Sequence, residues 1–310
     1  LEPVHTFEAW GVYLQRLFRM GFGGLGLAAA ALGTVFPFLM KMAERDVHLP
    51  GRTLGWMLGL NTGGAILGSL LCGFVFLPKL GMWGTFQVLT VLYLLVGICL
   101  PVGWKGVALI SRFSALGGLV LVLTWADPSD FPVMGTSPSQ PAAEILEVWE
   151  ESDCTVAVVE WAGGHRAITV NAAYALGSTA AYQEQVDQAR IPLFLFPETE
   201  SICFIGLGTG ISAGAALGDA FPRVRRVVSC ELSPAVIEAA RKWIPEPMTG
   251  GVFTDPRSTV LAEDGRNYLM ATAETFDMIN ADLFLPYRRG AGSLYSLDHY
   301  RTAAKRLNPG

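Results

Sequence analysis

The sequence predicts a chain of two parts: a multi-span α-helical membrane bundle, then an α/β Rossmann-like domain preceded by a small β hairpin. Two patterns support this: four long apolar segments within residues 1–126, and a glycine-rich turn between two apolar runs within residues 201–231. The charges divide at the same place. Residues 1–126 carry eight Lys/Arg and four Asp/Glu, a net of +4, and residues 127–310 carry 14 and 23, a net of −9.

The apolar segments have the length of membrane-spanning helices. They are Met20–Met40, Leu54–Leu77, Met82–Trp104 and Gly106–Ala126, and only the last contains a charge, Arg112. Because a hydrocarbon core of about 30 Å needs about 20 helical residues, we expect about four spans within residues 1–126. The lipid bilayer is then a partner. The acidic balance of the second part argues against nucleic acid as a partner.

Residues 127–197 connect the two parts. Residues 127–153 begin with a stretch rich in Pro, Ser and Asp, which is typical of a linker. Residues 154–197 contain two β-rich runs, Thr155–Trp161 and Arg166–Asn171, on either side of Gly163-Gly164. This pattern predicts a β hairpin. A polar helix is expected over Ser178–Arg190, ending at Pro192.

Residues 198–310 predict a Rossmann-like, nucleoside-binding domain. Its first strand, Ser201–Leu207, runs into a turn that contains Gly206, Gly208 and Gly210, and a helix is expected over Ile211–Phe221. The glycines allow the backbone to approach a ligand closely. The second strand ends on Glu231, which can accept hydrogen bonds from two ribose hydroxyls. We expect this domain to be incomplete at its carboxyl end, where further strands usually follow.

Two more acidic residues end predicted strands. Thr259–Ala262 is followed by Glu263-Asp264-Gly265, and Phe276–Ala281 is followed by Asp282. In doubly wound sheets ligands bind at the carboxyl ends of the strands, so these residues are expected on one rim with the glycine turn. Each acid taken alone is as easily a solvated turn residue. Together with the glycine turn they predict a site for an adenosine-type ligand.

The five cysteines have no spacing typical of a metal site or of a disulfide framework. We expect buried structural thiols and no bound metal.

Several stretches of the sequence resemble the polyamine aminopropyltransferases, the spermidine synthase family, and more closely its membrane-embedded members with transporter-like helices fused to a synthase domain. The resemblance covers most of the chain from about Gly21 onward. The matching stretches are Gly51–Gly55, Asn61–Ala65, Gly73-Phe74, Tyr182-Gln183-Glu184, Gly206–Gly210, Glu231, Asp255-Pro256-Arg257, Asp264-Gly265-Arg266, and Asp282 with Gly290–Tyr295.

The resemblance implies a domain of the S-adenosylmethionine-dependent transferase type. Decarboxylated S-adenosylmethionine would be the aminopropyl donor and a small amine the acceptor. Glu231 would hold the ribose and Asp264, beside Gly265, the adenine amino group. Asp282 would accept the proton of the attacking amine, with Tyr182 beside it. A carboxylate within hydrogen-bond reach of an amine can act as such a base.

The sequence departs from the family pattern where the aminopropyl group and the acceptor would bind. The glycine loop usually carries an Asp where Thr209 stands, and the catalytic loop usually carries a second carboxylate where Leu285 stands, before Pro286. The Asp-Gly of the family's amino-terminal hairpin is Asn171-Ala172 here, and the Gln expected after it is absent. The nucleoside half of the site is therefore kept while the acceptor half is altered.

Three functions stay open on the sequence alone. The first is a membrane-bound aminopropyltransferase-like enzyme. The second is a methyltransferase that uses intact S-adenosylmethionine. The third is a catalytically silent accessory subunit of a larger membrane complex. Loop charges alone would place the α/β domain on the external side of the membrane, opposite the cytoplasm. An adenosyl co-substrate requires the cytoplasm, and we expect an integral protein of the inner (cytoplasmic) membrane with this domain in the cytoplasm.

Overall fold

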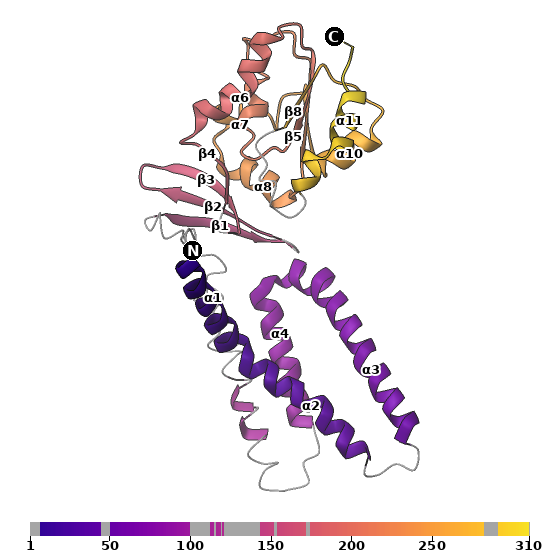
Figure 1. The fold of residues 1–310 in the computed structure, drawn as a ribbon. Coiled ribbons are helices and arrows are strands. Elements are labelled where there is room, and N and C mark those ends of the chain that lie inside the picture. The colour runs from indigo at the N-terminus through magenta and orange to yellow at the C-terminus, as the bar shows by residue number, and fades with distance from the viewer. Residues whose placement is uncertain are drawn as a thin grey trace. The chain divides into compact units, whose positions relative to one another are not determined.

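The structure, a computed structural model, describes residues 7–44, 50–99, 112–114, 116–118, 120, 143–151, 154–171, 174–281 and 291–309. The chain divides into two compact units, residues 1–72 and residues 73–310. Figure 1 shows the helices of the amino-terminal third and the α/β elements that follow them. The two units are described one after the other.

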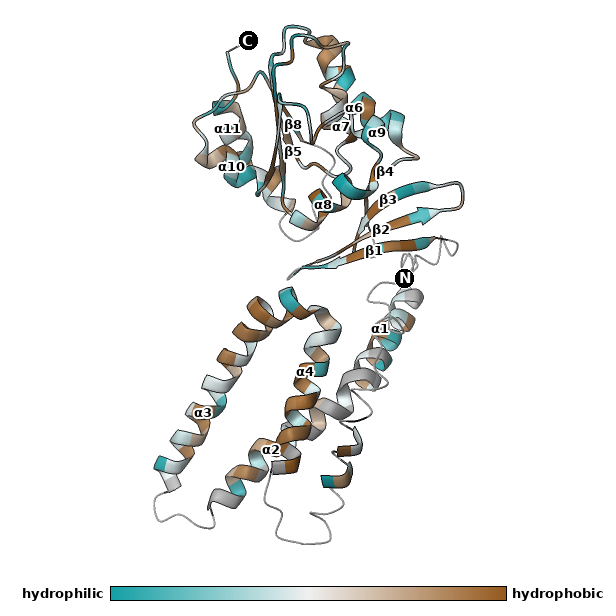
Figure 2. Cartoon of the chain, turned by 180° about the vertical axis from the view of Figure 1, so that it is seen from behind, coloured by the Kyte–Doolittle hydropathy of each residue, from teal (hydrophilic) through white to brown (hydrophobic). Residues whose placement is uncertain are grey.

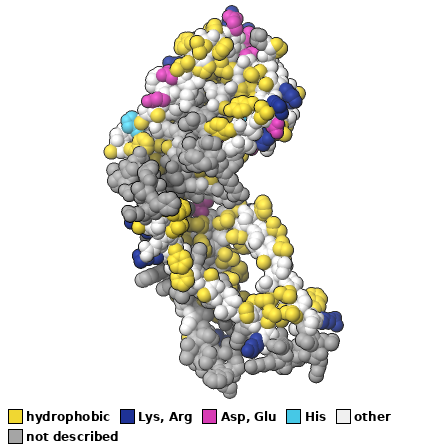
Figure 3. Space-filling view, viewed as in Figure 1, with side chains coloured by type: hydrophobic (Ala, Val, Ile, Leu, Met, Phe, Trp, Pro, Cys, Tyr) yellow, Lys and Arg dark blue, Asp and Glu magenta, His cyan; other side chains and the backbone are white. Residues whose placement is uncertain are grey.

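The first unit is helical. Helix α1 (Phe7–Gly21) continues through a short π-helical segment, η1 (Phe22–Gly26), into α2 (Leu27–Glu44), and α3 (Pro50–Leu71) follows. Apolar side chains of α3 are exposed along its length (Figures 2 and 3). A soluble helix normally buries such residues against a core.

The second unit begins within η2 (Cys72–Phe76), and α4 (Leu77–Cys99) follows, with its helical backbone interrupted at Gly81, where φ is 68°. Within the described residues one helical stretch, Gly51–Val96, has the length and apolar composition needed to cross a membrane. The expected bundle of about four spans is therefore not shown. Most of the fourth expected span, Gly106–Ala126, lies outside the residues that the structure describes.

A four-stranded antiparallel sheet follows, in the order β1-β2-β3-β4. Its strands are β1 (Glu144–Glu150), β2 (Thr155–Trp161), β3 (His165–Val170) and β4 (Tyr174–Ser178). The predicted hairpin corresponds to β2 and β3, and the prediction missed the two outer strands, β1 and β4. Strand β1 lies inside the stretch that was expected to be a linker, where it pairs with β2 along its length.

The second sheet is parallel, in the order β7-β6-β5-β8. It consists of β5 (Ser201–Ile205), β6 (Arg226–Glu231), β7 (Ser258–Ala262) and β8 (Met278–Ala281), close to the four predicted strands. The chain starts in the middle of the sheet, adds two strands on one side and then crosses to the other. This order is typical of a doubly wound sheet, with its switch point at β5 and β8.

Helices cover both faces of the parallel sheet (Figure 1). They are α6 (Tyr182–Leu195), α7 (Ile211–Ala215), α8 (Pro234–Trp243), α9 (Glu246–Thr249), α10 (Gly265–Ala271) and α11 (Leu297–Lys305), with a 3-10 turn, η4, over Ala291–Tyr295. Helix α6 runs past Pro192, which had been expected to end it. Helix α7 is shorter than the predicted Ile211–Phe221, and Ser233 caps α8 just before Pro234, which stands at the first helical position.

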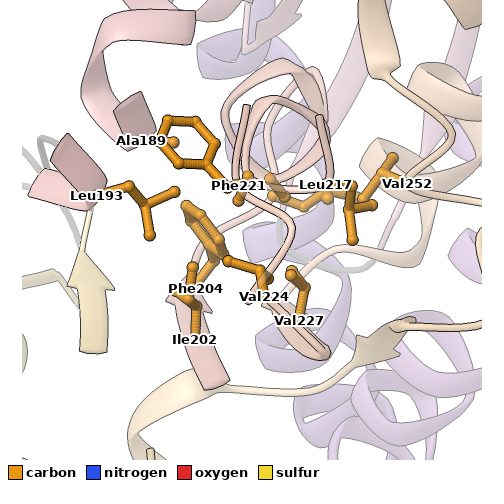
Figure 4. Packing of buried hydrophobic residues seen from close by; sticks show 12 residues of the cluster. Ala189, Leu193, Ile202, Phe204, Leu217, Phe221, Val224, Val227 and Val252 are labelled. Carbon is orange, nitrogen blue, oxygen red and sulfur yellow. The ribbon is translucent and has the colours of Figure 1, made fainter. Parts of the chain in front are cut away.

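Two groups of buried side chains position the candidate site. The first packs α6 and α7 against β5 and β6, and Figure 4 shows Leu193, Phe204 and Phe221 among its members. The second joins the antiparallel sheet to the α/β domain, because Val158 and Ile168 contact the same cluster as Val186 of α6 and Val236 of α8. The antiparallel sheet is therefore attached beside the glycine turn.

Cys203 and Cys230 are both buried, on neighbouring strands β5 and β6. The hydrogen bond between the two thiols, with burial second, raises the pKa of Cys203 far above its usual range. These two cysteines are thiols, as are Cys72 and Cys154.

Candidate active site

Three glycines shape the turn after β5. Gly206, Gly208 and Gly210 have φ values of 96°, 55° and 80°, in the left-handed region that glycine adopts without strain. Gly206 donates its N–H to the Cys230 carbonyl at 2.8 Å, which joins the turn to β6. A Cβ atom at Gly210 would lie 3.1 Å from Cγ1 of Val252. The sequence prediction of a glycine turn at this place is therefore matched by backbone that requires glycine.

Glu231 is buried under this turn, with 8% of its surface exposed. Its Oε2 atom accepts hydrogen bonds from the N–H groups of Leu207 at 3.0 Å and Gly208 at 3.2 Å. Its Oε1 atom accepts a third from the N–H of Ser233 at 3.1 Å. A carboxylate offers about four lone-pair positions, so three are already used. Glu231 thus has a structural role that the sequence did not show.

An exposed apolar side chain follows Glu231 directly. Leu232 is 67% exposed at the carboxyl end of β6. A flat apolar ligand face, such as that of a purine base, can be covered by an exposed aliphatic side chain. Our sequence reasoning missed Leu232, although an apolar residue just past a strand-ending acid is a usable signal.

Asp264 and Gly265 lie at the end of the next strand, β7. Oδ1 of Asp264 caps helix α10 by accepting from the N–H groups of Arg266 at 2.8 Å and Asn267 at 3.2 Å. Oδ2 is not used in this cap. A Cβ atom at Gly265 would lie 2.8 Å from Cγ2 of Ile205, so the start of α10 packs closely on β5. One oxygen of Asp264 therefore fixes the side chain, and the other takes no part in the cap.

Thr209, at the family's Asp position, is only 2% exposed. Its hydroxyl donates to Oε1 of Gln185 at 2.5 Å, and Nε2 of Gln185 donates to the carbonyls of Ser178 at 2.7 Å and Ala181 at 2.8 Å. Gly177 leaves room for the pair, since a Cβ there would lie 2.5 Å from Oε1 of Gln185. Thr209 therefore ties the glycine turn to α6 as part of a neutral, buried network.

Of the two predicted catalytic residues, the structure describes Tyr182 and does not describe Asp282. Tyr182 begins α6 and is partly buried against the cluster that joins the two sheets. Asp282 lies outside the described residues, as do Leu285 and Pro286. The strand before Asp282 is described: β8 ends at Ala281, which pairs with Ile205, the residue before Gly206. The chain therefore leaves β8 at the same end of the sheet as the glycine turn.

Asp255 and Arg257, also part of the resemblance, form an internal brace. The Arg257 guanidinium bonds both carboxylate oxygens of Asp255 and donates to the carbonyls of Leu217 at 2.7 Å and Val224 at 3.1 Å. Arg257 lowers the pKa of Asp255 below its usual range. These residues hold the connection after α7 and do not face the glycine turn through any of these bonds.

A cavity of about 470 Å³ lies at the opposite end of the parallel sheet. It is lined by Glu198, Ser201, Arg226, Asp277 and Asn308, near the amino ends of β5, β6 and β8. Oδ2 of Asp277 accepts from the N–H groups of Glu200 and Ser201, so this acid is engaged in the fold. We assign the candidate site to the carboxyl ends, where the glycine turn and the strand-ending acids are.

Within the described residues no group of three or more His, Cys, Asp or Glu side chains is arranged to hold a metal ion.

These features define an α/β domain whose candidate site lies at the carboxyl ends of a doubly wound parallel sheet. Residues 180–310 match the family described as the spermine/spermidine synthase domain. The chain is 29% identical over 300 residues to the polyamine aminopropyltransferase of Corynebacterium efficiens, covering 92% of this chain and 56% of that protein. It is 25% identical over 307 residues to that of Mycobacterium tuberculosis, covering 93% and 56%. The spermidine synthase family is thus supported by the domain match and by the relatives.

The chain spans about half the length of the curated relatives it matches. Solved structures give a weaker likeness. A spermidine synthase in complex with the transition-state analogue AdoDATO has 23% sequence identity and a TM-score of 0.48, covering 53% of this chain and 55% of that one. The spermidine synthase of Thermotoga maritima has 22% identity and a TM-score of 0.46, covering 53% and 54%.

Proposed function

We propose that this chain is a membrane-bound, spermidine synthase-like transferase. Its α/β domain binds decarboxylated S-adenosylmethionine and transfers the aminopropyl group to a small amine. The observation that carries the proposal is the three-glycine turn closed by buried Glu231, with Asp264 capping the helix after the neighbouring strand. The names of the relatives, polyamine aminopropyltransferases, favour aminopropyl transfer over methyl transfer.

In this proposal the residues have separate roles. Glu231 accepts a hydrogen bond from a ribose hydroxyl, and Oδ2 of Asp264 accepts one from the adenine amino group. The nitrogen of the acceptor attacks the aminopropyl carbon, a new C–N bond forms, and the C–S bond breaks. The sulfur leaves as a neutral thioether, so no acid is required. The proton lost by the nitrogen goes to the carboxylate of Asp282, a general base with Tyr182 beside it.

The acceptor in this proposal is not a simple diamine. Thr209, which is buried and bonded to Gln185, and Leu285 stand where the family resemblance implies carboxylates. Leaving an ammonium group poorly paired in a partly desolvated site is costly. A larger or less charged amine therefore fits these substitutions better than putrescine does.

The same network favours a second candidate, a subunit that binds the nucleoside without transferring anything. Thr209 is buried and already bonded to Gln185, so it cannot hold the aminopropyl ammonium without rearrangement. In this reading the chain is an accessory subunit of a membrane assembly, and its nucleoside site is a remnant or a sensor.

Product formation by the purified full chain tests these candidates. Wild type, Asp282→Asn and Leu285→Asp are compared with decarboxylated S-adenosylmethionine and a panel of amines, with the exposed Glu263→Gln as control. We expect weak transfer to putrescine that Asp282→Asn abolishes and Leu285→Asp improves. Equal activity of wild type and Asp282→Asn would remove Asp282 as the base. Absent activity in every variant, with calorimetric binding of methylthioadenosine intact, would favour the silent subunit.

The proposed location is an integral membrane position, with the α/β domain on the cytoplasmic side where the adenosyl donor is found. It is supported by the exposed apolar stretch Gly51–Val96 and by the charge-free segments of the sequence. Protection of cysteines introduced into the α/β domain from an impermeant thiol reagent in intact cells would agree with it.

A further inference from the structure

We propose that helix α1 (Phe7–Gly21) lies in the plane of the membrane–water interface, with one face in the lipid and two arginines toward anionic headgroups. This inference concerns the binding of a lipid surface by a helix that lies almost entirely before the first span expected from sequence, Met20–Met40. It rests on the membrane-bound part of the proposed function and is independent of the transfer chemistry.

The side chains of α1 separate into two faces. Trp10, Leu14, Leu17 and Phe18 are spaced at i, i+4, i+7 and i+8, which places them on one side of a helix. Gln15, Arg16 and Arg19 fall on the other side, together with the apolar Val12. Phe18 is 69% exposed, and the other apolar side chains of this face are exposed as well. The unit containing α1 therefore does not bury this face.

Aromatic rings concentrate on the apolar side. The rings of Trp10 and Tyr13 stack with centroids 5.4 Å apart, and those of Phe18 and Phe22 stack at 5.7 Å. Amphipathic rings of Trp and Tyr are enriched at the level of lipid headgroups. A helix with Trp, Phe and Leu on one face and arginines on the other is typical of segments that lie in the interface.

Charge and continuity identify lipid as the occupant. Arg16 and Arg19 complement anionic headgroups, and Arg19 lies in the last turn of the helix. Helix α1 continues through Phe22–Gly26 into the apolar helix α2, so α1 lies next to any lipid that α2 contacts. A spanning position is disfavoured because Gln15, Arg16 and Arg19 would then lie within or near the hydrocarbon.

Spin labels on the full chain test this position. The chain is reconstituted in vesicles of phosphatidylcholine with phosphatidylglycerol, and in vesicles of phosphatidylcholine alone. Cys72, Cys99 and Cys154 are replaced by Ser, and labels are attached at Leu14→Cys and Phe18→Cys on one face and at Val12→Cys and Gln15→Cys on the other. Relative accessibility to oxygen and to a water-soluble nickel complex reports the depth of each label.

We expect the labels at 14 and 18 to be oxygen-accessible and deeper than those at 12 and 15 by roughly 5–10 Å, the depth to which such helices insert. Depth should then follow the helical period. A steady change of about 1.5 Å per residue along α1 would show a spanning helix and overturn the proposal. Low accessibility of 14 and 18 to both reagents would show that protein covers this face. High nickel accessibility at all four positions would show that α1 is in water.

A label at Leu60→Cys, on the exposed helix α3, distinguishes failure of the membrane location from failure of the interfacial position of α1. If that label is not oxygen-accessible, the membrane location itself fails. If it is, while α1 gives one of the contrary patterns, only this inference fails. The double variant Arg16→Gln/Arg19→Gln should abolish the extra depth that phosphatidylglycerol gives to the label at 14. Arg225→Gln, an exposed arginine of the α/β domain, is the matched control. A depth at 14 that is independent of phosphatidylglycerol would overturn the role of the arginines.

Discussion

Replacing Glu231 by Ala should weaken both the fold of the α/β domain and its affinity for a nucleoside. The carboxylate accepts three backbone N–H groups, from Leu207, Gly208 and Ser233, in a nearly dry position. Hydrogen bonds to a charged group contribute about 1.5–3 kcal/mol each, and a buried donor left without an acceptor costs about 1–3 kcal/mol. Water can enter the space left by the side chain, so the three contributions do not add in full.

We therefore expect Glu231→Ala to lower the free energy of unfolding by about 2–5 kcal/mol. For a domain of this size, about 2–4 °C of melting temperature is lost per kcal/mol. The melting temperature should then fall by roughly 5–15 °C. Thermal unfolding of the purified full chain in detergent, followed by near-ultraviolet circular dichroism, measures this. Glu263→Ala, an exposed acid at the end of the neighbouring strand β7, should leave the melting temperature unchanged.

Titration calorimetry with methylthioadenosine, performed well below the melting temperature of the variant, measures the second effect. The loss of the ribose acceptor should weaken binding by about 1–3 kcal/mol, or roughly 5-fold to 150-fold. A variant with unchanged melting temperature and unchanged affinity would refute the assignment of Glu231 altogether. A stability loss with unchanged affinity would restrict Glu231 to holding the glycine turn.

Three further predictions concern the stability of the full chain. Burial lowers the pKa of His299, so the unfolded state binds more protons than the folded state does. The free energy of unfolding should therefore fall as the pH drops below about 6.5. His299→Leu should reduce this dependence on pH, measured by urea titrations between pH 7 and 5. Arg257→Lys should cost about 1–3 kcal/mol by chemical denaturation, and should reduce the loss of stability below about pH 4 that comes from protonating Asp255. Gly214→Ala should cost about 3 kcal/mol or more and prevent recovery of folded protein, since its Cβ would lie 1.8 Å from the carbonyl oxygen of Thr249.

The two central parallel strands, β5 and β6, were predictable because they are buried and read as short apolar runs. Ser201–Ile205 and Arg226–Glu231 appear within a residue or two of their expected bounds. Strand β1 was missed because three of its seven residues are Glu and it follows a Pro-rich stretch. Pairing with β2 supplies the hydrogen bonds that make these residues a strand, and the local sequence does not predict this tertiary effect.

The backbone conformation of the candidate site could be predicted from the sequence, but the hydrogen bonds of its side chains could not. The glycines and Glu231 have a sequence signature, because positive φ and a strand-ending acid require particular residues. The bonds of Glu231 to the turn, and of Thr209 to Gln185, join residues 23 or 24 positions apart. No local pattern encodes such pairs. Asp282 remains a prediction from sequence, because it lies outside the described residues.

The Thr209–Gln185 pair limits which side chains can stand at position 209 of the proposed transferase site. Oε1 of Gln185 faces the Thr209 hydroxyl, and both Nε2 hydrogens of Gln185 are directed to the carbonyls of Ser178 and Ala181. An Asp at position 209 would therefore meet an acceptor oxygen, and turning the amide to supply a donor would forfeit both bonds to the residues just before α6. The substitution and its partner form one unit. A neutral residue at 209 is built into the packing beside the glycine turn, which is why restoring the family's carboxylate there would need a second change at Gln185.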